Sequence, residues 1–151
     1  MRLVRTDGVT MDQQNKAQRA FASRLLAAER PGASAGDHAA AAARVYEKIS
    51  LCLAPLVGAT GVRALFVRSL VLTIPEYPFL GGVLVEQPEA GVNTLRASLQ
   101  GQKPDAVLQS AAALFGTFLT LLSTYVGDRL TAQVLRTAWP DLAETFFKET
   151  K

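Results

Sequence analysis

The segment from Ala106 to Val126 contains no charged residue, and Asp105 and Asp128 flank it. As an α-helix, which rises about 1.5 Å per residue, it approaches the thickness of a bilayer. On a helical wheel, small and hydroxyl residues gather on one side of the segment and large apolar residues on the other. Because a helix with no charged face has little contact with water, we predict that residues 106–126 form the central helix of an all-α domain.

A membrane span is the alternative interpretation of this segment. The hydroxyl residues along one side argue against it, as does the lack of flanking basic clusters and of an aromatic belt. Residues 1–10 alternate apolar and charged side chains and contain no apolar stretch of the length that a secretory signal needs. We therefore expect a cytoplasmic protein whose charge-free helix is protein core, and we do not expect an integral membrane protein.

Length and composition fit one globular domain. The chain has 151 residues, of which 49% are hydrophobic and 19% charged, enough to enclose a full core. Apolar periodicity, capping residues and turn residues predict a single bundle of about six helices around the central one. The further helices expected are residues 12–29, 34 or 37 to about 53 before Pro55, 61–72, 90–100, 129–138 and 142–147, and residues 83–85 could be extended.

The excess positive charge lies at the N-terminus. Residues 1–30 hold six basic and three acidic residues, whereas the rest of the chain holds ten of each. The Pro31-Gly32 break separates this segment from the remaining helices, so we predict a basic N-terminal helix or arm, 1–30, and a bundle core, 34–151, that folds without it. An excess of three charges is too small for a nucleic-acid reader, although attachment to an anionic membrane or nucleic acid stays an alternative. The candidate basic surface is Arg2, Arg5, Lys16 and Arg19.

The sequence argues against catalysis, a metal site and a cofactor. His38 is the single histidine and Cys52 the single cysteine, so the usual multi-ligand metal sites and internal disulfides lack their residues. If both lie on one helix, they are about 21 Å apart, too far for a cysteine–histidine pair. Haem ligation in a globin would need a histidine much later in the chain, and no phosphate-binding loop is present. We expect His38 to be exposed at a helix start, and the protein to be no enzyme.

Small and hydroxyl residues on the central helix allow two interpretations. The favoured one is close packing against another helix, for instance the alanine block at 39–43, with hydroxyls bonded back to the preceding turn. The alternative is a polar-walled pocket of a small-molecule-sensing bundle. The candidate pocket residues are Gln109, Gly116, Thr117, Thr120, Thr124 and Tyr125.

Apolar residues outside a single helical stripe predict an interface. Leu26 lies opposite the Phe21–Leu25 face, and adjacent Phe146 and Phe147 cannot share one face. Tyr77 and Phe79 lie in a loop stiffened by prolines, where they either close the core or anchor a partner. We therefore predict a non-enzymatic helical protein-interaction module, regulatory or adaptor in role, that forms a homodimer.

Overall fold

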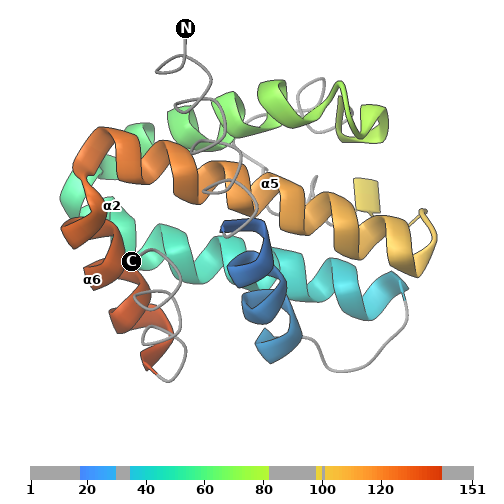
Figure 1. Ribbon diagram of the computed structural model, residues 1–151, viewed down its shortest axis with the longest axis horizontal. Coiled ribbons are helices and arrows are strands. Elements are labelled where there is room, and N and C mark those ends of the chain that lie inside the picture. The colour runs from blue at the N-terminus through green and yellow to red at the C-terminus, as the bar shows by residue number, and fades with distance from the viewer. Residues whose placement is uncertain (1–17, 30–34, 82–97, 100, 141–151) are drawn as a thin grey trace, which may run out of the picture.

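The computed structural model describes residues 18–29, 35–81, 98–99 and 101–140 (Figure 1). All the regular secondary structure in these ranges is helical, which confirms the predicted all-α class. The expected extended piece at 83–85, most of the expected helix at 90–100 and the expected terminal turns at 142–147 lie outside the described residues.

Helix α2, Ala35–Thr73, is two helices joined at a sharp break. Gly58 has a φ of 81° and a ψ of 159°, a backbone conformation that side chains with a Cβ rarely adopt. Here the chain reverses, so that residues 59–73 run back past residues 35–57 (Figure 1). We call residues 35–57 the first arm and residues 59–73 the second arm. The sequence predicted these two helices correctly but ended the first before Pro55. Pro55 lies at an exposed position inside the helix, where its missing N–H donor is tolerated. The break occurs at Gly58 instead.

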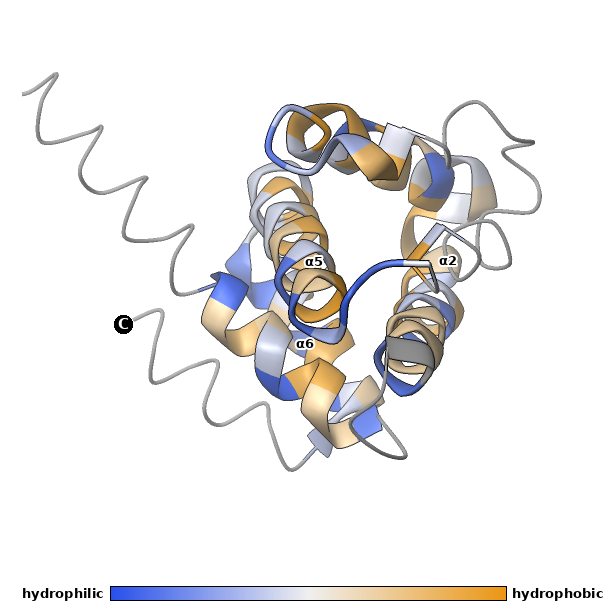
Figure 2. Ribbon diagram, turned by 90° about the vertical axis from the view of Figure 1, so that its right-hand side faces the viewer, coloured by the Kyte–Doolittle hydropathy of each residue, from blue (hydrophilic) through white to orange (hydrophobic). Residues whose placement is uncertain are grey.

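Helix α5, Pro104–Val126, contains the charge-free segment and packs against α2 and α6. Pro104 suits the start of the helix, because its missing N–H group would have no partner within the helix. Asp105 suits the same turn, because the free N–H groups there favour negative charge. Gly127, with a φ of 92°, ends the helix and lets the chain turn into α6, Asp128–Ala138. Helix α6 is amphipathic, and its buried residues are Thr131, Ala132, Val134 and Leu135. Figure 2 shows α5 nearly end-on beside α2. Trp139, at 5% exposure, caps the core after this helix.

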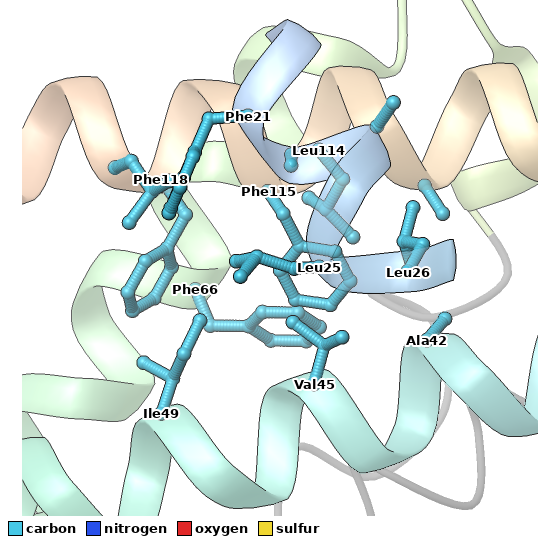
Figure 3. Close-up of a cluster of buried hydrophobic side chains, with 14 of the residues drawn as sticks. Phe21, Leu25, Leu26, Ala42, Val45, Ile49, Phe66, Leu114, Phe115 and Phe118 are labelled. Atoms are coloured by element: carbon cyan, nitrogen blue, oxygen red, sulfur yellow. The ribbon is translucent and has the colours of Figure 1, made fainter. Parts of the chain in front are cut away.

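The helix formed by residues 18–29 crosses α5 and contributes to the common core (Figures 1 and 3). Phe21, Leu25 and Leu26 are each at most 1% exposed. The expectation that Leu26 is an interface residue is therefore wrong. Because this helix fits between α5 and the first arm, it buries more than one narrow stripe, and Leu26 lies beside Ala42 in Figure 3. The division into an arm and a separable core stays a prediction, but this burial favours one folding unit.

The proline-stiffened loop after α2 closes one end of the core. Residues 74–76 form a turn, and the short 3-10 helix η1, Pro78–Leu80, comes next. Leu80 is fully buried, and the half-buried rings of Tyr77 and Phe79 pack against the core and meet edge-on, with centroids 6.2 Å apart. These contacts match the core-closing interpretation of the loop better than the interface interpretation.

Two of the described helices are long and apolar enough to cross a membrane, judged by length and composition alone. In Pro104–Val126, 67% of the apolar window is buried, whereas in Asp37–Thr73 only 28% is. The first value is that of a core helix in a folded protein. The second leaves most residues of that window of α2 at least partly exposed.

Candidate interaction surface

The small-residue side of α5 is occupied by the helix 18–29. A Cβ atom added to Gly116 would lie 2.7 Å from the Arg19 Cγ atom and 2.9 Å from its backbone N and Cα atoms. The absent side chain at Gly116 thus lets the two helix backbones approach closely. The close contact that the sequence predicted here is present, but its partner at Gly116 is helix 18–29, not the alanine block.

The predicted pocket residues do not surround one cavity. Gly116 is covered by Arg19, and Thr117 and Thr120 are half-buried. The hydroxyls of Thr120 and Thr124 donate hydrogen bonds to the backbone oxygens of Gly116 and Thr120, at 3.0 and 2.9 Å. Gln109, Thr124 and Tyr125 are exposed, and Tyr125 lines an apolar groove together with Val126 and residues of α2.

Replacing Gly116 with Ala is expected to destabilise the protein. The new methyl group would overlap the Arg19 backbone, which cannot move without shifting helix 18–29, and such overpacking typically costs about 1–3 kcal/mol. Chemical denaturation measures the loss. Gly101→Ala is the matched control, because a Cβ there meets nothing within 4 Å. Equal stability of the two variants would contradict the close approach.

Most of the predicted basic surface lies outside the described residues, and Arg19 is its one described member. Arg2, Arg5 and Lys16 lie outside them. Arg19 donates two hydrogen bonds to the carboxylate of Glu76, at 2.9 and 3.2 Å, and so joins helix 18–29 to the turn after α2. This pairing offsets the charge of Arg19, which leaves it less suited to attract an anionic surface.

A second polar link joins three elements and was not predicted. Glu29, with a side chain 10% exposed, accepts hydrogen bonds from the Lys48 Nζ atom and from the Trp139 indole N–H, the latter at 2.9 Å. The Lys48 ammonium also lies 5.5 Å from the centroid of the Trp139 ring, within the range of a cation–π contact. Because these residues are far apart in the sequence, no local pattern indicates their meeting.

Acid is expected to destabilise the fold through these two links. Burial by itself would raise the pKa of Glu29, but the hydrogen bonds from Lys48 and Trp139 outweigh it and lower the pKa below its ordinary value. The hydrogen bond from Arg19 lowers the pKa of Glu76 in the same way. Carboxyl groups whose pKa is lower in the folded state stabilise it above their unfolded pKa and lose this contribution as the pH falls. The thermal midpoint should thus fall as the pH is lowered through the acid range where carboxylates titrate, and the fall should be smaller in Glu29→Gln. An unchanged pH profile in that variant would contradict the assignment.

Among the described residues, the most exposed apolar side chains are not those predicted for the interface. Tyr77 and Phe79 are half-buried against the core, Leu26 is buried, and Phe146 and Phe147 lie outside the described residues. The large apolar residues that the described surface exposes most lie on α2 and at the end of α5. They are Leu51 at 76%, Leu56 at 46%, Val71 at 44%, Leu72 at 47% and Tyr125 at 69%. Continuous apolar runs in α2 could have indicated this surface, but their burial depends on how the two arms pack.

An apolar groove runs between the second arm and the C-terminal end of α5. Its volume is about 330 Å³, and it is lined by Val57, Gly61, Ala64, Leu65, Arg68, Tyr125 and Val126. We call it the α2–α5 groove. Its surface is almost wholly apolar, and the exposed side chain of Arg68 supplies its charged group. Arg68 forms no ion pair with any residue that the structure describes. From residue 49 to residue 75 the sequence contains two arginines, Arg63 and Arg68, and no acidic residue.

His38 and Cys52 do not form a reactive pair in this fold. The expectation that His38 is exposed is wrong, because it is 5% exposed, and its Nδ1 atom has no hydrogen-bond partner among the described residues. It lies in the first turn of α2, directly before the alanine block at 39–43, most of which is also buried. Cys52 is half-buried near the other end of the first arm and is a free thiol. Within the described ranges, no three His, Cys, Asp or Glu residues are grouped so that they could hold a metal ion.

Comparison with protein-family models, with curated proteins and with solved structures finds no match for this chain.

Proposed function

We propose that this protein is a non-enzymatic, cytoplasmic helical module that binds protein, in the first place a second copy of itself, in a regulatory or adaptor role. The observation that carries the proposal is the apolar surface of α2 with the adjoining α2–α5 groove. Contiguous apolar patches on a folded domain usually mark an interaction site. We further propose a single bundle of about six helices with α5 at its centre, supported by the contacts of α5 with α2, α6 and helix 18–29.

The composition of the groove favours a protein partner over nucleic acid. Cores of protein interfaces are apolar and contain few charged residues, with tyrosine and arginine enriched. The α2–α5 groove combines Val57, Ala64 and Leu65 with Tyr125 and a single cation, Arg68. A phosphate backbone would need several cations close together. The pairing of Arg19 with Glu76 likewise gives less support to attachment through a basic N-terminus.

Small-molecule sensing is the second candidate function, and we propose the α2–α5 groove as its site. A volume of about 330 Å³ is at the lower end of the range for small-ligand pockets. The α2–α5 groove supports this function better than the hydroxyl side of α5, where helix 18–29 covers Gly116. An apolar ligand that raises the thermal midpoint in the wild type but not in Tyr125→Ala would favour the sensor.

Tyr125→Ala is expected to weaken self-association without unfolding the domain. Exposed aromatic side chains at the centre of an interface often contribute about 2 kcal/mol or more to binding. Light scattering across a concentration series measures the monomer–dimer equilibrium. Gln109→Ala, at an exposed position near the other end of α5, is the control and should leave the equilibrium unchanged. Equal association of both variants with the wild type would contradict a role for the groove.

A further inference from the structure

The first arm carries an exposed stripe that complements the α2–α5 groove. Arg44, Glu47, Leu51 and Pro55 recur every three or four residues and are all exposed, so they share the outer side of the first arm. Leu51, at 76%, is the most exposed large apolar residue of the described surface. Glu47 lies one turn before it and forms no ion pair with a described residue. The stripe thus presents an acidic group and, one turn later, an apolar side chain.

The groove presents the matching pair in the opposite order. Ala64, exposed and small, precedes the exposed cation of Arg68 by one turn. In both pairs, four residues separate the charged group from the apolar position, a rise of about 6 Å along the helix. If the first arm of one molecule lies antiparallel to the second arm of another, one register satisfies both pairs. It places Glu47 opposite Arg68 and Leu51 opposite Ala64. The same register brings Ala54 opposite Gly61, so that two small residues come opposite each other.

Within one molecule this contact cannot form, because the two arms already pack against each other through their inner sides. The Tyr46 and Phe66 rings meet there, with centroids 4.4 Å apart. The outer side of the first arm is left for another molecule. The two arms of one copy are themselves roughly antiparallel. A two-fold axis along the arms therefore places the first arm of each copy antiparallel to the second arm of its partner, so that both contacts form at once.

We propose that the protein forms a two-fold dimer in which the first arm of each copy lies in the α2–α5 groove of the other, with Glu47 paired to Arg68 and Leu51 against Ala64. This inference rests on the proposed self-association and specifies its contact. Two observations favour a second copy over a bilayer: the surface is a groove and not a convex face, and the chain itself carries the acidic group that Arg68 lacks. Each copy then fills the groove of the other.

Charge reversal tests the pairing in the full-length chain. In light scattering at micromolar concentrations, Arg68→Glu and Glu47→Lys are each expected to weaken dimerisation at least about tenfold, because each places like charges opposite each other. Mixing the two variants should restore the dimer, since in the mixed pair one contact joins the original residues and the other joins the reversed charges. Arg63→Glu, an equal charge change on the second arm outside the groove, should leave the dimer intact.

The two contacts of the mixed dimer are not equivalent, and this sharpens the test. One joins Glu47 of the Arg68→Glu copy to Arg68 of the Glu47→Lys copy, as in the wild type. The other joins the new lysine to the new glutamate, again of opposite sign. Among the variants, both contacts are therefore attractive only in the mixture, whereas each variant alone has two repulsive contacts.

The outcomes separate this inference from the proposed function. If the wild type dimerises and the single reversals do not weaken it, or the mixture does not restore it, the inference is overturned and self-association stands. An Arg63→Glu effect equal to that of Arg68→Glu also overturns it. A monomeric wild type overturns both the dimer contact and the proposed self-association. Binding of the wild type to anionic vesicles would then assign the exposed apolar surface of α2 to a membrane. Circular dichroism checks that each variant is folded. Where a charge-reversal variant is unfolded, Glu47→Gln and Arg68→Gln are used in its place.

Discussion

Removal of residues 1–30 is expected to abolish the cooperative unfolding transition of this protein. Phe21, Leu25 and Leu26 are at most 1% exposed. Full burial of such a side chain contributes about 1.5–3 kcal/mol, so the three together contribute about 4.5–9 kcal/mol. A domain of this size is stable by only about 5–15 kcal/mol in total. The deletion also removes Glu29 from Lys48 and Trp139, and Arg19 from Glu76.

Thermal and urea denaturation monitored by circular dichroism compare the full chain with residues 31–151. We expect a broad, non-cooperative change or an insoluble product for the shortened chain. Phe21→Ala is the milder variant, with an expected loss of about 3–5 kcal/mol. Ala28, on the exposed side of the same helix, gives the control Ala28→Ser, which should lose much less. A sharp transition in the shortened chain would instead confirm the separable core that the Pro31-Gly32 break predicts.

Leu119→Ala is expected to cost about 2–5 kcal/mol, the range for a large-to-small change that leaves a cavity in a closed core. Leu119 and Leu122 are fully buried on α5, among side chains from α2 and from helix 18–29. In a bilayer, the same truncation would leave the chain in an apolar solvent and would cost much less. The experiment therefore also tests whether α5 is protein core.

Leu121→Ala is the matched control, because Leu121 is half-buried on the same helix and should lose less stability. Denaturant titration of the wild type and of both variants gives the free energies of unfolding. We expect all three proteins, without tags, in the soluble fraction of a cell lysate. Recovery of the wild type only after detergent extraction of membranes would contradict a core role for α5.

Within the described residues, the sequence was sufficient for the helices and for most of their ends. Local chemistry determines these features, because Gly58 and Gly127 adopt positive φ values that stop a helix. The break at Gly58 was placed before Pro55, since proline usually ends a helix, whereas here it lies at an exposed position inside one. The burial of Leu26 and His38 was not predicted, because it depends on neighbours that are distant in the sequence.

The interaction surface was predicted less well than the fold. Small residues around Gly116 correctly predicted a close helix contact, but their spacing could not identify the partner. Tyr125 was chosen as a pocket residue of the hydroxyl side, whereas it lines the α2–α5 groove. Leu51 was missed because its helix is apolar on several sides, and only the packing of the two arms determines which side is left outside.

The solution mass of the full chain tests the central proposal most directly. Light scattering coupled to size-exclusion chromatography, at micromolar concentration and at low and moderate salt, gives this mass without a calibration of shape. We expect twice the 16.2 kDa of the monomer. A mass of one chain under all these conditions would contradict self-association, and the small-molecule sensor would then become the better proposal.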